Sequence, residues 1–128
     1  MRYLDEEQLL LIHGFVVEET GGSHGVRDMH AIRSTAELPK QQVFGVELYP
    51  TVFDKAAVYT RNIITAHPFL DGNKRTGMTA AIVFLEKNGQ VFTAPKGEVA
   101  RFALEIVSHK HGIPKIAAWL RKNSKKRS

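Results

Sequence analysis

The residues best suited to chemistry in this sequence lie together, between His67 and Arg75. A histidine, a carboxylate, a glycine and two cations occur within the run His67-Pro68-Phe69-Leu70-Asp71-Gly72-Asn73-Lys74-Arg75. An apolar segment, residues 77–85, follows almost at once. A polar cluster in front of a buried helix is an unusual arrangement for stability alone. This stretch therefore predicts a functional site.

The second half of the cluster has the features of a phosphate site. A helix N-terminus exposes unpaired N–H groups and carries a partial positive charge. Lys74 and Arg75 add positive charge there, which is unfavourable unless an anion binds. Gly72 leaves room for a ligand to approach the backbone, and Asn73 can donate a side-chain hydrogen bond to the same anion. These residue types together favour phosphate binding.

Asp71 and His67 would complete a site for group transfer. A carboxylate can hold Mg²⁺ against phosphate oxygens, and an imidazole can act as a general base toward an incoming hydroxyl. A base, a metal-binding carboxylate and an anion site are what transfer of a phosphorus group from a nucleotide to an alcohol requires. The alternative is a helix-terminal histidine, a capping aspartate and two solvated cations. It explains each residue singly but not the cluster.

Two long helices are predicted on either side of the cluster. Residues 51–66 begin with a threonine cap and a carboxylate three residues later, and Pro68 disfavours helical geometry just before it. Residues 73–87 form the second helix, which Gly89 ends. Apolar residues surround this second helix, which predicts a central, buried position.

The other segments are expected to form the scaffold of a mainly all-α domain. Amphipathic patterns predict helices over residues 5–19, 28–37, 97–109 and from 113 onward. His13 is expected to be a satisfied, half-buried histidine. The connection Gly21–Val26 is glycine-rich but lacks a complete phosphate-loop pattern, and we interpret it as flexible. Residues 90–95 are expected to be a short connection.

Residues 43–49 are β-branched and aromatic in an otherwise helical chain, which predicts a short β-hairpin or flap. A single hairpin must pack on the helices or offer its edge to a partner strand. An irregular packed loop is an equally good interpretation of these residues alone.

Length and composition predict one domain over residues 1–120. The chain has 128 residues, 43% hydrophobic and 24% charged, which are globular values. It has no cysteine, which excludes disulfides and thiolate metal sites and suits a reducing compartment. No apolar run reaches the length of a membrane span, and no signal-peptide core follows Met1. We therefore expect a cytoplasmic protein without membrane contact.

The net charge of +5 comes from the C-terminus, because residues 121–128 contain five cations and no acid. We expect a disordered, solvated tail. No other segment forms a basic face, so we do not expect direct binding to nucleic acid.

The run from His67 to Arg75 resembles the Fic/Doc motif, His-x-Phe-x-Asp/Glu-Gly/Ala-Asn-Gly/Lys-Arg. The rest of the chain is similar to the Doc (death-on-curing) branch of that family. The similar segments are Ile12-His13, Gly21-Gly22, Gly25–Asp28, Glu47–Pro50, Phe84-Leu85, Asn88-Gly89 and Ala117–Leu120.

The resemblance implies a Fic-type helical domain in which the motif loop joins two core helices. It implies that His67 is the base, that Asp71 holds Mg²⁺ and that residues 72–75 bind the phosphates of ATP. It also implies that a flap over residues 43–49 aligns the protein substrate. The flap residues in this chain are Val46, Glu47, Leu48 and Tyr49, and the phosphate-binding residues are Gly72, Asn73, Lys74 and Arg75.

Doc-type proteins are toxins of toxin–antitoxin pairs. The resemblance therefore implies phosphorylation of a Ser or Thr hydroxyl of a translation factor, with elongation factor Tu as the expected target, and arrest of protein synthesis. The chain lacks the Ser/Thr-x-x-x-Glu-Gly/Asn motif of self-inhibited Fic proteins. We therefore expect inhibition by an antitoxin that binds through an amphipathic segment.

Two positions depart from the wider Fic pattern. Lys74 stands where AMP-transferring members have glycine, and Met78 stands where they have a second arginine. Both departures are similar to Doc and favour transfer of the γ-phosphate. Transfer of AMP to a protein hydroxyl is the alternative. A second alternative, a non-catalytic nucleotide- or DNA-binding module, depends only on the basic tail.

Overall fold

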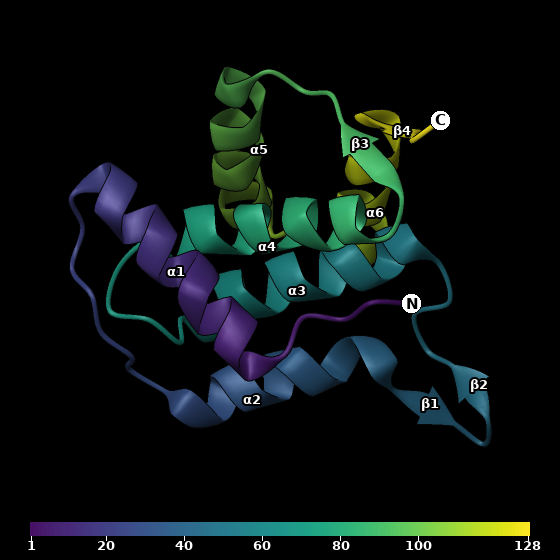
Figure 1. Cartoon of the computed structure of the whole chain (residues 1–128), viewed down its shortest axis with the longest axis horizontal. Coiled ribbons are helices and arrows are strands. Elements are labelled where there is room, and N and C mark those ends of the chain that lie inside the picture. Colours follow the sequence, from purple (N-terminus) through teal and green to yellow (C-terminus); the bar gives the residue numbers. More distant parts are fainter.

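Six helices and two small strand pairs make up the computed structural model, which describes residues 1–128 (Figure 1). The helices are α1 (Glu6–Thr20), α2 (Met29–Glu37), α3 (Val52–Ala66), α4 (Asn73–Lys87), α5 (Lys96–His109) and α6 (Ile113–Lys122), with a 3₁₀ turn at Leu38–Lys40. The strands are β1 (Gln42–Val43), β2 (Val46–Glu47), β3 (Gln90–Phe92) and β4 (Ser124–Lys126). The predicted mainly α-helical fold is confirmed.

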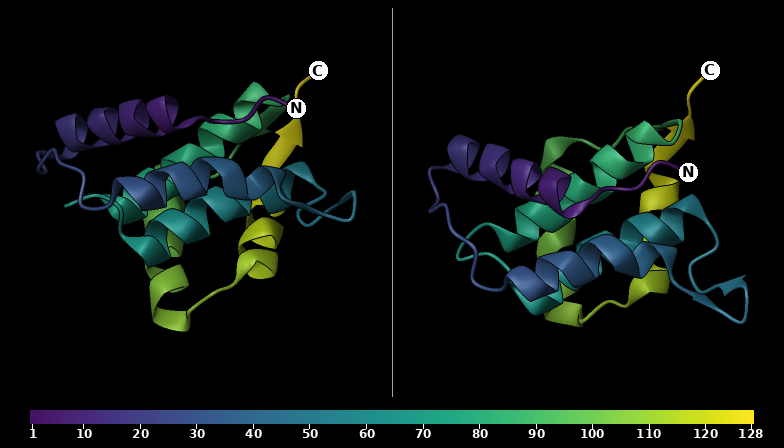
Figure 2. Two further views of the ribbon diagram at one scale, coloured as in Figure 1. Left: turned by 90° about the horizontal axis from the view of Figure 1, so that it is seen from below. Right: turned by 60° about the horizontal axis from the view of Figure 1, so that its bottom comes forward.

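The helices α3 and α4 lie side by side in the centre and run in opposite directions (Figures 1 and 2). Small residues let them approach closely. A Cβ atom on Gly77 would lie 3.0 Å from the backbone oxygen of Thr60. The Thr60 hydroxyl donates to the Gly77 carbonyl oxygen at 2.8 Å. The predicted central position of α4 is confirmed, and the contact fixes how the two ends of the intervening loop are spaced.

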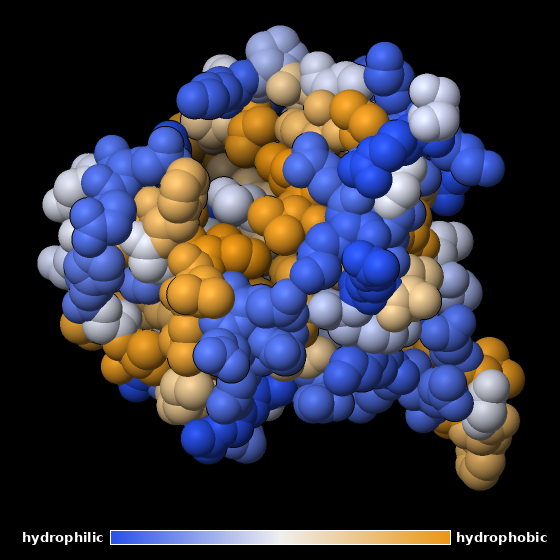
Figure 3. All heavy atoms as spheres, viewed as in Figure 1, coloured by the Kyte–Doolittle hydropathy of each residue, from blue (hydrophilic) through white to orange (hydrophobic).

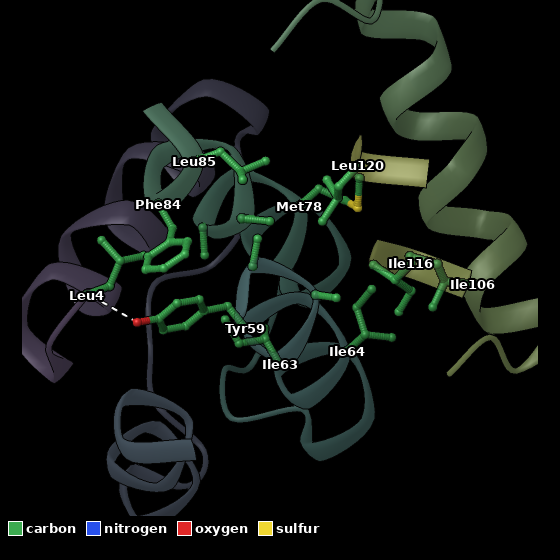
Figure 4. Close-up of a cluster of buried hydrophobic side chains, with 14 of the residues drawn as sticks. Leu4, Tyr59, Ile63, Ile64, Met78, Phe84, Leu85, Ile106, Ile116 and Leu120 are labelled. Atoms are coloured by element: carbon green, nitrogen blue, oxygen red, sulfur yellow. Dashed lines mark hydrogen bonds between the residues drawn. The ribbon is translucent and has the colours of Figure 1, made fainter. Parts of the chain in front are cut away.

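The other helices enclose this pair from both sides. The helices α1 and α5 pack on α4, and α2 and α6 pack on α3. Figure 2 shows α6 and the end of α5 on the side of the pair away from α1. Leu4 anchors the N-terminus, because its N–H donates to the hydroxyl of buried Tyr59 at 2.9 Å (Figure 4). Burial raises the pKa of Tyr59 to about 12.

Met78 is fully buried in this core. Figure 4 shows its side chain beside Leu120, on the side of α4 that faces α6. Position 78 therefore packs the interior in this chain and takes no part in the polar surface at the start of α4. An apolar side chain at position 78, where the wider Fic pattern has an arginine, is consistent with this buried environment.

The predicted helix starts are confirmed in detail. Asp5 caps α1 in a reciprocal capping box with Gln8, and Thr51 caps α3 in the same way with Asp54. Asp28 caps α2 through the Ala31 N–H. None of the six helices has the length and hydropathy that crossing a bilayer requires.

Residues 121–128 differ from the expected disordered tail. Strand β4 pairs antiparallel with β3, in the register Gln90 to Lys126, Val91 to Lys125 and Phe92 to Ser124. The segment 90–95, expected to be a plain connection, therefore contains a strand. The two strands are far apart in the sequence and each is polar or short. Their pairing arises because α4 and α6 bring their ends together, which no local pattern reports.

The predicted hairpin is confirmed. Strands β1 and β2 pair antiparallel, and the turn residues Phe44 and Gly45 both have positive φ, of 50° and 79°, as hairpin turns of this length favour. A buried lysine anchors the hairpin to α3. The ammonium of Lys55 donates to Glu47 at 2.8 Å and to the Pro39 carbonyl at 3.0 Å, while its side chain is 1% exposed.

Removing the carboxylate of Glu47 should destabilise the fold, because it leaves the buried Lys55 ammonium without its counter-charge. We expect Glu47→Ala to lower the free energy of unfolding by about 2 kcal/mol, measured by urea denaturation. Glu37→Ala, which breaks the exposed pair with Lys40, is the matched control and should cost about 0.5 kcal/mol or less. Equal losses in the two variants would contradict the anchoring role of Lys55.

Candidate active site

The motif loop, residues 67–72, begins with a strained backbone at His67. This residue caps the end of α3 in the left-handed region, with φ 49° and ψ 57°, which is costly for any residue except glycine. Its N–H donates to the Ile63 carbonyl at 3.1 Å, and the Arg27 Nε donates to its carbonyl oxygen at 2.7 Å. Bonds on both sides of the residue hold it in this conformation, while its side chain remains exposed.

The interior of the motif loop is closed by Asn73. Its Oδ1 accepts from the Phe69 N–H at 3.0 Å, and its Nδ2 donates to the Phe69 carbonyl at 2.9 Å. The Asn73 side chain is buried and bridges the loop. Its predicted donation to an anion therefore competes with a structural role, whereas its backbone N–H lies at the start of α4.

His13 supports the motif loop from α1. Its ring stacks on Phe69, with centroids 3.8 Å apart and planes at 4°. Its Nε2 lies 2.8 Å from the Asp71 carbonyl oxygen, and because a carbonyl only accepts, Nε2 carries the proton. The prediction of a satisfied histidine is confirmed, although the residue is more buried than expected. No local pattern around His13 indicates that its partner is the motif loop.

The connection Gly21–Val26 also packs on the motif loop, so its interpretation as a merely flexible link was wrong. The Ser23 N–H donates to Asp71 Oδ2 at 3.2 Å. A Cβ on Gly22 would lie 2.7 Å from the same oxygen, and one on Gly25 would lie 2.5 Å from the Leu70 side chain. These glycines permit a close approach between two loops, which is why the segment carries them.

Asp71 is exposed and only partly hydrogen-bonded. Its Oδ1 accepts from the Gly72 N–H at 2.9 Å, and its Oδ2 accepts from Ser23. A carboxylate has about four acceptor positions, so capacity remains for a cation. No cluster of three or more His, Cys, Asp or Glu side chains surrounds it. A divalent ion here would complete its shell with phosphate oxygens and water, as Mg²⁺ does at nucleotide sites.

The start of α4 has no side-chain cap. Gly72 is the N-cap residue, in the left-handed region with φ 76°, and the first N–H bonded back to the loop is that of Thr76. The N–H groups of Asn73, Lys74 and Arg75 therefore remain free for an anion. The hydroxyl of Thr76, buried one turn into the helix, has no partner.

Two clefts meet at this helix start. The first, of about 400 Å³, contains Asp71 and residues 72–75, with α1 and α5 as its walls. The second, of about 390 Å³, contains His67 between the ends of α3 and α5. Lys74 lines both clefts. The structure thus brings the predicted base and the predicted phosphate-binding residues to two neighbouring clefts that share Lys74.

The predicted flap is only partly brought to this site. The strands of the hairpin lie at the beginning of α3 (Figure 1), and the 15 residues of that helix separate them from His67 by about 22 Å. Tyr49 lies closer, in a small pocket of about 110 Å³ that also contains Arg61. Because Arg61 borders the His67 cleft as well, it connects the base of the hairpin with the site.

Replacing His13 should loosen the motif loop without unfolding the protein. His13→Phe retains the stacked ring but loses the hydrogen bond to Asp71, worth about 1 kcal/mol. We expect faster amide hydrogen exchange at Phe69 and Leu70, whose N–H groups are bonded within and across the loop. His30→Phe, at an exposed position of α2, is the control. Unchanged exchange in His13→Phe would show that the stacking alone orders the loop.

Comparisons with known proteins agree with this arrangement. Residues 3–85 match the profile of the Fic/DOC family. The protein named Toxin Doc from Mycolicibacterium smegmatis is 38% identical over 87 residues, which are 68% of this chain and 65% of that relative. The protein named Protein kinase doc from Escherichia phage P1 is 30% identical over 124 residues, 95% of both chains. With its motif loop, its helix pair and this match over most of its length, the chain belongs to the Fic/Doc family.

Proposed function

We propose that this protein is the toxin of a toxin–antitoxin pair and a protein kinase. It transfers the γ-phosphate of ATP to a Ser or Thr hydroxyl of a translation factor, with elongation factor Tu as the expected target. The observation that carries the proposal is that His67 and the uncapped start of α4 lie in two clefts that share Lys74. The names of the two relatives, a toxin and a protein kinase, support it.

Each group has a role in this reaction. The free N–H groups of residues 73–75, with the Lys74 and Arg75 side chains, bind the phosphates and balance the charge that develops on them. His67 accepts the proton of the incoming hydroxyl. The hydroxyl oxygen then bonds to the γ-phosphorus, and the bond from that phosphorus to the bridging oxygen breaks, so that ADP leaves with the electron pair. Mg²⁺ held by Asp71 would neutralise phosphate charge.

Lys74 favours phosphate rather than AMP as the transferred group. Its side chain borders both clefts, so its ammonium can reach the phosphate that lies nearest the base. In that position it would crowd a transferred AMP and stabilise a terminal phosphate, which carries more charge. Transfer of AMP is the competing chemistry that an isotope experiment distinguishes.

An apolar groove offers a place for the antitoxin. It lies between α1 and α5 and is lined by Phe15, Ile82 and Val99, among others. Figure 3 shows apolar side chains gathered around the hollow at this place. The groove shares Arg75 with the phosphate cleft. An amphipathic antitoxin segment seated there would bury exposed Phe15 and cover Arg75, and so would exclude the nucleotide.

His67→Ala should abolish both phosphoryl transfer and toxicity while the fold persists, because the exposed imidazole makes no packing contact in the core. We expect the rate of labelling of a lysate protein by γ-labelled ATP to fall by a factor of about 100 or more, and growth arrest on expression to disappear. His30→Ala is the control, and circular dichroism checks folding. Toxicity that survives in His67→Ala would instead favour a binding module.

The position of the radioactive phosphate in ATP should identify the transferred group. Wild-type protein should transfer label from γ-labelled but not from α-labelled ATP, and Lys74→Gly should transfer γ-label about 10- to 100-fold more slowly because a phosphate-binding charge is lost. Lys87→Ala, at the other end of the same helix, is the matched control for charge. Protein labelling by α-labelled ATP in the wild type would establish AMP transfer and overturn the kinase proposal.

A further inference from the structure

Apart from Thr65, every polar side chain that lines the cleft beside His67 is basic. Besides His67, four basic side chains border its volume of about 390 Å³, and no carboxylate does. The four are Arg61, Lys74, Lys110 and His111. They come from α3, α4 and the connection between α5 and α6. A concave surface that gathers one sign of charge from three separate elements favours an anionic occupant.

Lys110 occupies a position where a helix end favours glycine. It follows α5 with φ 51° and ψ 48°, and its N–H bonds back to the carbonyls of Ile106 and Val107. This left-handed conformation is costly for a residue with a side chain. The chain retains a lysine there, and the lysine borders the cleft. Favourable interaction with the negative end of α5 is a second role for the same charge, which the experiment below separates.

His111, the next residue of the connection, is held in place by hydrogen bonding. Its Nε2 lies 2.7 Å from Glu105, whose other carboxylate oxygen accepts from Arg101 at 2.7 Å. These hydrogen bonds, first that from His111 and then that from Arg101, keep the pKa of the Glu105 carboxyl below its usual range. Glu105 is therefore ionised and the proton lies on Nε2 of His111. The imidazole is fixed, with Nδ1 as its remaining polar atom.

We propose that this cleft is a second anion subsite, in which Lys110 and Arg61 bind an acidic group of the acceptor substrate close to its hydroxyl. The inference depends on the proposed kinase function. We assign the cleft to the acceptor because His67, which must contact the acceptor hydroxyl, lines it. The free N–H groups at the start of α4 belong to residues that line the other cleft, which is therefore the nucleotide site. Arg61 extends the basic surface toward Tyr49 at the base of the hairpin. An extended segment of the acceptor protein could therefore bind along the surface from the hairpin to His67.

Inorganic phosphate tests the subsite without reference to activity. In an amide NMR titration of the full chain, we expect phosphate to shift two sets of signals, those of residues 72–75 and those of residues 110–111. Lys110→Gly should lower the phosphate affinity reported by residues 110–111 several-fold and leave the affinity reported by residues 72–75 unchanged. Glycine is favoured at this position, so the variant is expected to fold. Shifts confined to residues 72–75, or equal titrations of Lys110→Gly and wild type, would overturn the proposal.

Kinetic measurements assign the subsite to the acceptor or the nucleotide. With γ-labelled ATP, Lys110→Gly should need several-fold more lysate protein for half-maximal labelling, with an unchanged half-saturating ATP concentration. Lys110→Arg should restore the wild-type value, and Lys125→Ala, on the remote strand β4, is the charge-matched control. A higher half-saturating ATP concentration, with an unchanged amount of lysate protein for half-maximal labelling, would overturn the assignment to the acceptor. If wild-type protein transfers no label, the kinase function fails, and the phosphate titration alone decides whether the anion subsite exists.

Discussion

The close approach of α3 and α4 is the constraint on which the rest of this structure depends. Gly77 has no side chain where a Cβ would meet the Thr60 backbone, and the Thr60 hydroxyl bonds across the gap. The two helices are therefore fixed in both separation and axial position. Because the motif loop joins them, its ends are fixed too, and only a tightly turned path from His67 to Gly72 connects them.

That path is strained at its start and is held by contacts from elsewhere in the chain. His67 occupies the left-handed region, Phe69 is buried under His13, and Asp71 accepts hydrogen bonds from its own loop and from the connection after α1. The polar groups of the loop that would otherwise be buried without partners are thus satisfied. Rigid placement of this kind suits a site that works by positioning and electrostatics, since such a site loses activity when its groups are displaced.

Charge is distributed on this surface in a way that stability does not require. Lys74 and Arg75 lie at the positive end of α4, where the helix dipole disfavours them, and Lys110 sits in a strained position at the end of α5. Glu105, the acidic side chain next to the second cleft, is hydrogen-bonded to His111 and Arg101. The surface therefore presents two adjoining basic clefts with one lysine between them. Unfavourable arrangements of this kind become favourable when anions bind.

Local sequence by itself determined the helices, their caps and the motif loop, because these follow from spacing, capping residues and turn chemistry over a few positions. It left a hairpin and an irregular loop as equal alternatives for residues 43–49. It also determined which residues form the candidate site, since they are contiguous in the chain. Only the tertiary structure decided what lies against them. It paired β3 with β4, placed His13 and the glycine-rich connection on the motif loop, and set the hairpin strands at the far end of α3. It also assigned the side chain of Asn73 to the loop. Contacts between distant segments depend on the packing of whole helices, and no pattern within one segment records them.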